Sequence, residues 1–458
     1  MSRIVGVIDI GRSTAKVATV DLDSLSEVDS RKTPNTVVTG VPYPHHDTDS
    51  LWRFVTEALA ELNRDHPVDA LCVTAHHAAA ALVDEHGELA LPVLDANYAG
   101  PDATAADYNR LRPEFAETFT PRLPGGHNLG AQLHWQSRAF AAEFASVRWI
   151  VPYPQFWAFR LTGVPASELS SLGCHTDLWN FETDLYSSLV LKQGWLDLMP
   201  EVRPASDILG LVRPELCAEL GLKPRVPVHV GIEEDNATLL PHLLEHKAPV
   251  GVVVARGPWI DVYAPGGNLA TLDPARDCLA NLDAMGRPIP TARFMGIKEY
   301  ARLVGDTPPA HIGDAAVARV LDESIMLLPA VAEGSGPFPD RKARWTYPEH
   351  TLDNEARFVA VSFYLALMTA ECLELTGADG NTVVDGPFAG NRLFIEMLVA
   401  ATERPVEPMT GARASASLGA ALLARLQPRV VEHPARAPIQ GSPLMSAYAQ
   451  KWRQAVGG

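Results

Sequence analysis

The sequence predicts two α/β domains, and three observations support this. With 458 residues the chain is too long for one ordinary hydrophobic core, so two domains of roughly 200 residues each are expected. In the first half, strand-like stretches alternate with helix-like ones, which is typical of a mostly parallel sheet covered by helices. The glycine-bearing hairpin at 4–20 also has an echo at 249–263. Two like-built domains would face each other across a cleft, and two unrelated hairpins are the alternative.

The individual elements follow from the spacing of apolar residues. Residues 68–74 and 225–231 are apolar enough for buried strands, and the helical spacing of 51–62 predicts a helix. Near the C-terminus, 382–385 is expected to be a strand that passes through a small-residue turn into a helix over 392–401. Such a turn at a helix N-terminus can cradle a nucleotide, although packing alone also requires small residues there.

Composition and charge exclude several classes of protein. The hydrophobic content of 47% and the charged content of 20% are those of a soluble globular protein. A net charge of -17 argues against a surface for nucleic acid or anionic membrane, although a local positive pocket for a nucleotide remains compatible with it. The longest apolar stretch, 358–368, is too short to span a bilayer and is expected to be a core helix.

The five cysteines and the N-terminus indicate a cytoplasmic location. The cysteines are odd in number and scattered, without a Cys-x-x-Cys pair, which favours buried thiols in a reducing compartment over disulfides or a zinc site. The N-terminus enters a strand directly, without a basic segment followed by an apolar one, so we expect no signal peptide.

The opening hairpin carries the first chemical signal. An apolar strand runs into Asp9 and the turn at Gly11, and such a turn can present backbone amides to a phosphate. The carboxylate of Asp9 can hold a magnesium-bound water. An ordinary hairpin turn is the competing interpretation.

In their order along the chain, several motifs resemble those of the FGGY carbohydrate kinases of the actin/hexokinase-like ATPase superfamily, most closely the fuculokinase- and rhamnulokinase-like branch. The motifs are Asp9-Ile10-Gly11, Gly125-Gly126-His127-Asn128-Leu129-Gly130, Pro152 to Trp157, Ser171 to Trp179, Gly231 to Ala237, Arg293 to Gly296, and Gly386 to Asn391. The resemblance covers residues 1–425 and implies two ribonuclease-H-like domains facing each other across a cleft. It implies an N-terminal domain at 1–245 and a nucleotide-binding domain at 246–427, and 428–458 is left as a C-terminal extension.

What the resemblance implies chemically is phosphorylation of a hydroxyl on a small sugar, ketose or polyol, with ATP and Mg²⁺. By position, Asp9, Gly11, Arg12 and Ser13 match the first phosphate loop, Gly257 lies in the second phosphate hairpin, and Gly386, Pro387, Phe388, Ala389 and Asn391 match the adenosine-side loop. His76, Asn128 and Gln155 lie in segments that face the sugar in relatives, and stabilisation of loop backbones is their alternative role. A homodimer is implied by resemblance alone.

The chain departs from the family pattern at the position of the catalytic base. There the family has Asp, three residues before Ala237, and this chain has Glu234. Glu233 replaces the usual His of the branch and is expected, with His76, Asn128 and Gln155, to bind the substrate. Glu234 is expected to be the base and, with Asp9, a metal ligand; Asp235 takes the role of base if the register slips by one residue. Three adjacent carboxylates can also form a metal site or a solvated acidic loop.

A second departure lies in the second phosphate hairpin. Relatives have Thr-Gly-Thr-Trp where this chain has Arg256-Gly257-Pro258-Trp259. Pro258 has neither an amide hydrogen nor a hydroxyl, and Arg256 can either grip a phosphate or fill the space of the γ-phosphate. Arg12 stands where Lys is usual, and His77 and Ile297 stand where Gly is usual. Changes confined to the cleft indicate a repurposed active site.

Three hypotheses follow. The first is an active kinase with a changed acceptor. The second is a catalytically impaired homologue that binds a sugar or nucleotide as a sensor or partner subunit. The third retains transfer chemistry other than phosphoryl transfer, with Arg256 binding another anionic group.

Overall fold

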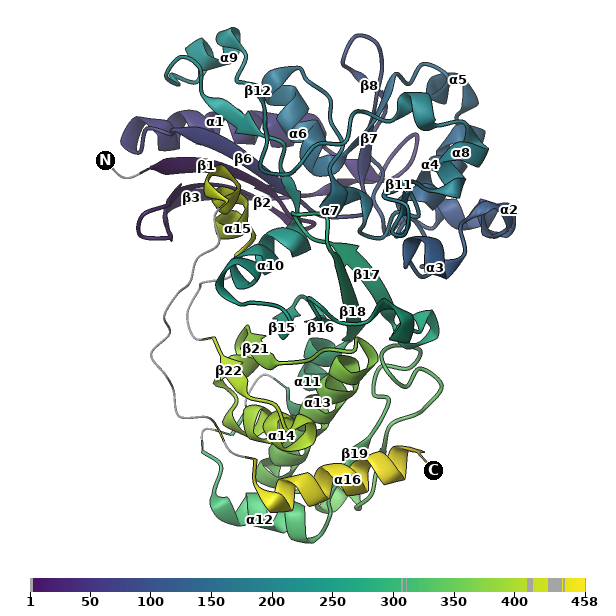
Figure 1. The fold of residues 1–458 in the computed structure, drawn as a ribbon, viewed down its shortest axis with the longest axis vertical. Coiled ribbons are helices and arrows are strands. Elements are labelled where there is room, and N and C mark those ends of the chain that lie inside the picture. The colour runs from purple at the N-terminus through teal and green to yellow at the C-terminus, as the bar shows by residue number, and fades with distance from the viewer. Residues whose placement is uncertain are drawn as a thin grey trace. The chain divides into compact units, whose positions relative to one another are not determined.

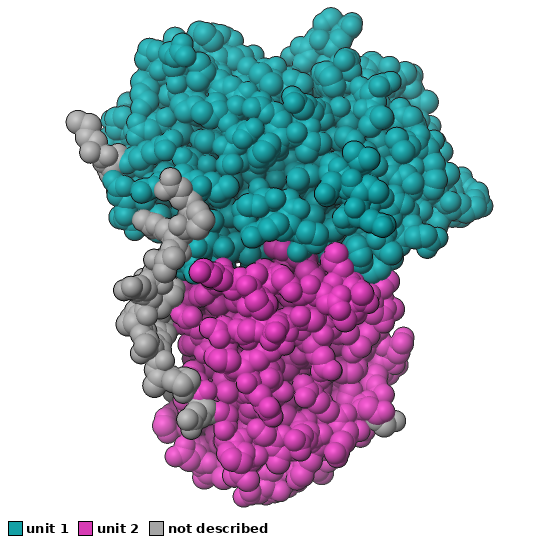
Figure 2. Space-filling model, viewed as in Figure 1, with its two compact units in different colours: residues 1–245, 280–288, 413–429 teal, residues 246–279, 289–412, 430–458 magenta. Residues whose placement is uncertain are grey.

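The computed structural model describes residues 3–305, 308–309, 311–409, 415–426, 439 and 441–457, which form a mixed α/β fold (Figure 1). The chain divides into two compact units, coloured separately in Figure 2. Unit 1 comprises residues 1–245, 280–288 and 413–429, and unit 2 comprises residues 246–279, 289–412 and 430–458. The expected domain boundary at 427/428 lies outside the described residues.

The sheet of unit 1 is mixed, which corrects the expectation of a mostly parallel one. Its strands are β1 (Ile4–Ile10), β2 (Thr14–Asp21), β3 (Ser26–Pro34), β6 (Ala70–Ala75), β12 (Ile208–Leu211), β13 (Pro227–His229) and β14 (Ile232–Glu233). The order is β12-β13-β6-β1-β2-β3, with β14 paired to β6. β1 runs parallel to β6 but antiparallel to β2, because the three residues of the turn join β1 and β2 as a hairpin.

The helices of unit 1 cover both faces of this sheet or carry the loops around it. They are α1 (Thr48–Asp65), α2 (Ala105–Leu111), α3 (Phe115–Thr118), α4 (Leu129–Ala139), α5 (Ala141–Phe144), α6 (Tyr153–Thr162), α7 (Leu169–Leu172), α8 (Ser188–Gln193), α9 (Pro214–Glu219), α10 (Glu234–Glu245) and α15 (Ala416–Leu422). Short strands form small sheets: β4 (Val37–Val38) with β5 (His45–His46), β7 (Ala80–Val83) with β8 (Leu89–Leu91) and β9 (Trp149–Pro152), and β10 (Trp179–Asn180) with β11 (Leu185–Tyr186).

The two faces of β1 enter different hydrophobic cores because successive side chains of a strand point to opposite faces. Ile8 and Ile10 pack in the core that α1 and α6 cover. Val5 and Val7 pack in the core to which α10 and α15 contribute. Since Asp9 is an odd-numbered residue of the same strand, its carboxylate lies on the α10 and α15 side. The alternation therefore determines which helices can supply partners to this acid.

Unit 2 repeats the arrangement of strands. The second large sheet, which is six-stranded, contains β15 (Val250–Arg256), β16 (Trp259–Tyr263), β17 (Cys278–Leu282), β18 (Pro288–Phe294), β21 (Asn381–Asp385) and β22 (Val406–Pro408), and residues 280–282 of β17 and Pro288 of β18 are counted with unit 1. The order is β17-β18-β16-β15-β21-β22. β15 is antiparallel to β16 and parallel to β21, just as β1 is antiparallel to β2 and parallel to β6. The echo predicted at 249–263 is thus confirmed at the level of strand order and direction.

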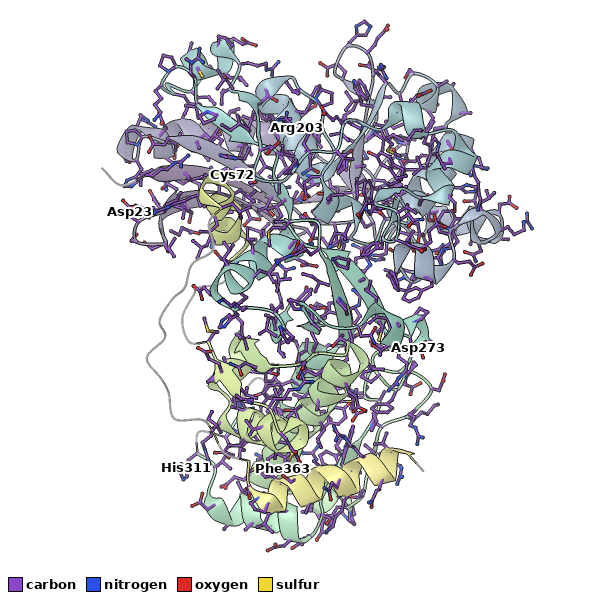
Figure 3. The ribbon with its side chains drawn as sticks, in the orientation of Figure 1. Asp23, Cys72, Arg203, Asp273, His311 and Phe363 are labelled. Atoms are coloured by element: carbon purple, nitrogen blue, oxygen red, sulfur yellow. The ribbon has the colours of Figure 1, made fainter. Side chains whose placement is uncertain are left out.

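The helices of unit 2 include a long apolar one. They are α11 (Gly296–Val304), α12 (Asp314–Asp322), α13 (Asn354–Leu375), α14 (Arg392–Thr402) and α16 (Pro443–Gly457), and β19 (Leu327–Leu328) pairs with β20 (Arg344–Trp345). Among the described helices, α13 alone is long and apolar enough to cross a membrane, but 78% of its apolar window is buried. Phe363 of α13 is fully buried, as is Cys72 of β6 in unit 1 (Figure 3). α13 is therefore the core helix that the sequence predicts.

The helix α16 lies in the segment expected as a C-terminal extension, and its side chains pack into the core of unit 2. Trp452 is fully buried, and its indole nitrogen donates to the carbonyl of Leu327 at 2.8 Å. The hydroxyl of Tyr448 donates to the carbonyl of Ile325 at 2.6 Å. These two hydrogen bonds satisfy polar groups that burial would otherwise leave without partners.

Candidate active site

The turn between β1 and β2 is held in one conformation by Asn35. The side-chain amide of Asn35 donates to the carbonyl of Gly11 at 2.9 Å, and its backbone amide donates to the carbonyl of Ser13 at 3.0 Å. In a trans peptide the carbonyl and the following N–H point in opposite directions, so the amide of Arg12 is directed away from Asn35. A Cβ atom on Gly11 would lie 2.9 Å from the carbonyl oxygen of Thr14, which explains the glycine.

Asp9 is positioned by the helix α15. The hydroxyl of Ser417, in α15, donates to Oδ2 of Asp9 at 2.9 Å, and the ammonium of Lys16 lies 4.0 Å from the same oxygen. α15 can approach this closely because Gly419 packs against the backbone carbonyl of Ala237 in α10, where any side chain would collide. Asp9 is thus a partly buried carboxylate with an oriented hydrogen-bond donor.

Glu234 and Arg12 border the same turn. The carboxylate oxygens of Glu234, the first residue of α10, lie 3.7 and 3.9 Å from the position that a Cβ atom of Gly11 would take. Burial lowers the pKa of the Arg12 guanidinium, while the nearby charges of Asp95 and Glu234 raise it. Because arginine keeps its proton at any physiological pH, Arg12 remains a fixed positive charge beside these acids.

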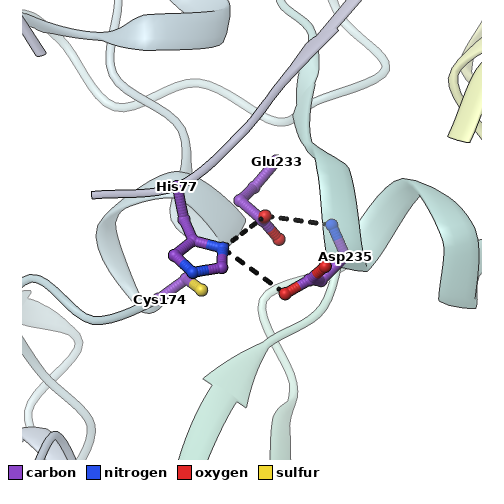
Figure 4. A group of neighbouring side chains, drawn as sticks. All are labelled: His77, Cys174, Glu233 and Asp235. Carbon is purple, nitrogen blue, oxygen red and sulfur yellow. Dashed lines mark hydrogen bonds and ion pairs between the residues drawn. The ribbon is translucent and has the colours of Figure 1, made fainter. Parts of the chain in front are cut away.

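Glu233 and Asp235 belong to a second group of side chains, which they form with His77 and Cys174 (Figure 4). Nδ1 of His77 lies 3.2 Å from Oε1 of Glu233 and 3.4 Å from Oδ2 of Asp235. Burial alone would lower the pKa of His77, but its contacts with Cys174 and Glu233 raise the pKa to about 9. The imidazole is therefore positively charged at neutral pH.

Glu233 also fixes the start of α10. Its carboxylate accepts hydrogen bonds from the backbone amides of Asp235 at 2.9 Å and Asn236 at 3.0 Å, in the manner of a helix N-cap. The side-chain amide of Asn236 adds a bond of 3.1 Å. These bonds set the orientation of the Glu234 and Asp235 side chains, which leave the helix in different directions, one beside Gly11 and the other beside His77.

His76 and Gln155 carry buried acceptor atoms. Nδ1 of His76 lies 3.2 Å from the carbonyl of His77, and burial lowers the pKa of His76 well below its usual value, so the ring is neutral. Its Nε2 and the Oε1 of Gln155 are both buried and have no hydrogen-bond partner among the residues that the structure describes. Gln155 itself is held through Nε2, which donates to the carbonyl of Gly231 at 3.2 Å. Both atoms can accept a hydrogen bond from a ligand hydroxyl.

Asn128 serves its own loop. Its Oδ1 accepts from the amide of Leu123 at 2.7 Å, and its Nδ2 donates to the carbonyl of Pro121 at 2.9 Å. The side chain is fully buried. These hydrogen bonds support the alternative role that the sequence left open for Asn128, which is stabilisation of a loop backbone.

In unit 2, the loop after β21 lines a cavity of about 790 Å³. Pro387, Phe388 and Asn391 contribute to its wall, together with the aromatic rings of Tyr300 and Phe358. Asn391 caps α14 by accepting from the amide of Phe394 at 3.2 Å. An apolar, aromatic wall beside a helix N-terminus suits a flat heteroaromatic ring that carries phosphates.

Gly386 and Ala389, the other two residues predicted for this loop, are not part of the cavity wall as described. Gly386 has φ of +93°, and a Cβ atom there would lie 2.9 Å from the carbonyl oxygen of Ala255 in β15. Ala389 is 8% exposed. Gly386 allows the loop to leave β21 and turn beside β15, which is a backbone requirement.

The second hairpin has a turn of two residues, Gly257 and Pro258, both exposed. Gly257 has φ of +55°, and no atom lies within 4 Å of a Cβ built on it. The carbonyl of Pro258 accepts from the amide of Lys298 at 3.3 Å. Arg256 pairs with Trp259 across the hairpin and is partly buried. This turn thus offers fewer amide hydrogens than the turn at Gly11.

Comparison with known proteins identifies the family. The model of the FGGY family of carbohydrate kinases, N-terminal domain, matches residues 4–240, and the model of the carbohydrate kinase FGGY, C-terminal domain, matches residues 247–433. The chain belongs to the FGGY carbohydrate kinase family. Its two units accordingly have the actin-like ATPase fold that the sequence predicts. The family resemblance inferred from ordered motifs is confirmed, and these matches identify no branch within the family.

Solved structures of carbohydrate, xylulose and glycerol kinases resemble this chain over its whole length. A carbohydrate kinase from Novosphingobium aromaticivorans is 31% identical, with a TM-score of 0.91 over 100% of this chain and 99% of that one. A xylulose kinase from Rhodospirillum rubrum is 18% identical, with a TM-score of 0.76 over 99% and 98%. Plasmodium falciparum glycerol kinase, solved with ADP, is 13% identical, with a TM-score of 0.78 over 100% and 98%. No curated protein matches the chain.

Three residues that contribute to this site were not singled out by the motifs from which the site was predicted. Asn35 follows an exposed strand, Ser417 lies in a run of small residues, and Cys174 is one of five scattered cysteines. A comparison of homologous sequences would single out such residues only if they were retained with Asp9 and Gly11. The structure brings each of them to the site from a distant part of the chain.

Proposed function

We propose that this FGGY family member transfers the γ-phosphoryl group of ATP to a hydroxyl of a small sugar, ketose or polyol, with Mg²⁺. The observation that carries the proposal is the split of the two acids at the start of α10. Glu234 borders the turn at Gly11, while Asp235 lies beside His77. A phosphotransferase needs one carboxylate near the phosphates and another near the attacking hydroxyl.

In this proposal Asp235 is the general base. The acceptor hydroxyl gives its proton to the Asp235 carboxylate as its oxygen bonds to the γ-phosphorus, and the bond from that phosphorus to the bridging oxygen breaks to release ADP. Glu234 then belongs to the phosphate side, together with Asp9. This assignment adopts the one-residue slip that the sequence leaves open and gives Glu234 the metal role.

The buried acceptor atoms of His76 and Gln155 support a polyhydroxylated acceptor. A neutral imidazole Nε2 and an amide oxygen each accept one hydroxyl proton, and a buried polar atom without a protein partner favours a ligand that supplies the missing hydrogen bond. Ketose, aldose and polyol substrates all present such donors. We assign Asn128 to positioning of the loop.

The donor set fits a hard metal ion. The carboxylates of Asp9 and Glu234 border one turn, and oxygen ligands from one or two carboxylates are what Mg²⁺ takes from proteins when it also binds phosphates. When bound, Mg²⁺ would offset the charge of the β- and γ-phosphates. The Ser417 hydroxyl holds Asp9 in orientation, Arg12 and the turn amides of Arg12 and Ser13 bind phosphate oxygens, and the cavity of unit 2 takes the adenosine.

The same proposal includes the first acceptor to test, the binding partners and the location in the cell. The likeness of the motifs to the fuculokinase- and rhamnulokinase-like branch favours a ketose as the first acceptor to test. Two small molecules, the sugar and the nucleotide, are the partners, with a homodimer as the expected assembly. The five free, buried cysteines suit the reducing cytoplasm.

The experiment is ADP release by the purified chain with ATP, Mg²⁺ and a panel of ketoses, aldoses and polyols, coupled to thermal shifts with each nucleotide. We expect ATP and ADP to raise the melting temperature and at least one acceptor to stimulate ADP release. Absence of any nucleotide binding at millimolar concentration contradicts the proposal. A Glu219→Gln variant, which changes an exposed acid of α9, is the control and should behave like the wild type in both assays.

The turn at Pro258 favours a second candidate, a catalytically impaired homologue that binds sugar or nucleotide as a sensor or partner subunit. Pro258 offers no amide hydrogen to a phosphate, and Arg256 can occupy the space of the γ-phosphate. In that case ADP would bind more tightly than ATP, and no acceptor would stimulate turnover. Binding of another anionic group by Arg256, with different transfer chemistry, would appear as stabilisation by that anion alone.

A further inference from the structure

Four side chains with metal-binding atoms converge in unit 1. His77 follows β6, Cys174 follows α7, Glu233 ends β14 and Asp235 lies in the first turn of α10. One ligand atom from each residue lies within 4.8 Å of all the others, and Figure 4 shows the four side chains turned toward one another. We propose that these four residues form a binding site for a borderline transition-metal ion of the Zn²⁺ class.

The distances suit such an ion. Nδ1 of His77 is 3.2 Å from the carboxylate oxygen of Glu233 and 3.4 Å from that of Asp235. Two ligands bound to zinc at their usual bond lengths in tetrahedral geometry are about 3.3 Å apart. The two distances from Nδ1 of His77 therefore already match two edges of a zinc site. Cys174 completes the set within the same 4.8 Å limit.

The chemistry of the set selects the class of metal. Imidazole nitrogen and thiolate sulfur favour Zn²⁺ or Co²⁺, whereas Mg²⁺ takes oxygen ligands almost entirely. The site is thus distinct in chemistry from the one proposed for Mg²⁺ at Asp9 and Glu234. One residue, Asp235, is shared with the proposed catalytic machinery.

Charge also favours a divalent cation here. The carboxylates of Glu233 and Asp235 lie close together, and the positively charged imidazole of His77 balances part of their charge. A divalent ion that displaces the proton of this imidazole would balance them more fully.

The site is built before any ion arrives, and it is open on one side. Glu233 is oriented by the amides of Asp235 and Asn236 and by the Asn236 side chain, as an outer shell orients a metal ligand. Cys174 and Glu233 are each 1% exposed, whereas the side chains of His77 and Asp235 are 22% and 17% exposed. An ion would enter past His77 and Asp235. The burial of Cys174 favours a metal ligand over a thiol that reacts with solutes.

The test is binding of Co²⁺ and Zn²⁺ to the full chain, freed of its affinity tag and stripped with chelator. We expect one Co²⁺ per chain, with the visible bands of tetrahedral cobalt and the near-ultraviolet charge-transfer band of a thiolate ligand. Zn²⁺ should displace it, and a large excess of Mg²⁺ should not. No cobalt binding, or a spectrum without the thiolate band, overturns the proposal.

Variants locate the ion. Cys174→Ser should abolish the charge-transfer band, and His77→Ala should weaken Zn²⁺ affinity by at least about 100-fold, the upper end of what loss of an outer-shell partner costs. Cys217→Ser, a buried cysteine elsewhere in unit 1, and His86→Ala, an exposed histidine, are the matched controls. Because the wild-type spectrum already decides for or against a thiolate site, a variant that misfolds leaves the test intact. Binding that persists in both site variants overturns the assignment.

A consequence for activity rests on the proposed function. If Asp235 is the base, a Zn²⁺ ion bound to its carboxylate prevents it from accepting the proton of the acceptor hydroxyl. Zinc should therefore inhibit phosphoryl transfer in the wild type, and it should inhibit the Cys174→Ser variant much less. Zinc binding without any kinase activity would leave the metal site standing and contradict only the proposed function. Zinc inhibition that Cys174→Ser leaves unchanged contradicts the link between the two.

Discussion

The two hairpins of this molecule have the same place in their sheets but different turns. β1 and β15 each pair with a parallel strand on one side and with the returning strand of the hairpin on the other. The first turn is three residues long and anchored by Asn35, whereas the second is two residues long and contains Pro258. Strand pairing is therefore the same in both units, while the number of amide hydrogens that each turn can offer a ligand depends on the few residues in that turn.

The acids next to the first hairpin should dominate activity. If Asp235 is the base and Glu234 serves the phosphates, Asp235→Asn should lower kcat by about 100- to 10,000-fold at unchanged affinity for Mg²⁺. Glu234→Gln should instead raise the Mg²⁺ concentration needed for half-maximal rate. Steady-state kinetics over a Mg²⁺ series measures both. The opposite pattern would return the role of base to Glu234.

A buried carboxyl group in each unit should make stability depend on pH. Burial raises the pKa of Glu168 in unit 1 and of Glu299 in unit 2, each to about 7. A raised pKa means that the folded state binds more protons than the unfolded state between about pH 4.5 and 7. The stability that each protonated carboxyl contributes, up to about 3 kcal/mol, is therefore present below that window and lost as the pH rises through it.

Denaturant unfolding across pH 4–8 tests this, with Glu168→Gln and Glu299→Gln compared with the wild type. Each variant should flatten the loss of stability between pH 4.5 and 7 and leave the rest of the curve unchanged. If the two units unfold in separate transitions, each variant should act on the transition of its own unit. A variant curve parallel to that of the wild type would mean that the carboxyl titrates normally.

The two turn glycines should differ in their tolerance of alanine. Gly11→Ala places a methyl group 2.9 Å from the backbone oxygen of Thr14, and such overpacking costs about 2 kcal/mol. Gly257→Ala meets no atom and bears only the cost of its left-handed backbone, about 1 kcal/mol. Free energies of unfolding from urea titrations give both numbers. Equal or reversed costs would show that the first turn is less confined than its contacts indicate.

Restoring a donor to the second hairpin should produce the smallest effect. Pro258→Thr adds an amide hydrogen and a hydroxyl, and one additional hydrogen bond to a phosphate should tighten ATP binding by about tenfold. Titration calorimetry with ATP measures it, and Pro348→Thr, at an exposed site of unit 2, is the control. Unchanged affinity would mean that this hairpin does not meet the nucleotide phosphates.

Periodic and ordered features of the sequence predicted most of the scaffold. The strand at 68–74, the helix at 392–401 and both hairpins were predictable because each is encoded within a short segment. The prediction of a mostly parallel sheet was wrong. Within a short segment, strands that return as antiparallel hairpins have the same apolar pattern as strands separated by helices, so the sequence does not show the direction of pairing. Only the pairing of β1 with β2 and of β2 with β3 makes the sheet mixed.

The candidate site was less predictable because its contacts join distant segments. Ser417 and Asp9 are 408 residues apart, and His77 and Glu233 are 156 residues apart. The absence of a Cys-x-x-Cys pair made a zinc site unexpected, yet the four proposed ligands come from three separate segments, at 77, 174 and 233–235. The sequence groups the acids at 233–235, and only the start of α10 shows that the Glu234 and Asp235 side chains leave in different directions. The assignment of individual site residues stays a prediction.

The anchoring of the first turn by Asn35 has a thermodynamic consequence. A loop that is ordered only when its ligand binds loses conformational entropy at that moment, on the order of 1–2 kcal/mol per residue. Here the carbonyls of Gly11 and Ser13 already accept hydrogen bonds from Asn35, so folding bears that cost, and under the proposed function a phosphate would not. An Asn35→Ala variant would shift the cost back to binding, and ligand affinity would then depend more strongly on temperature than in the wild type.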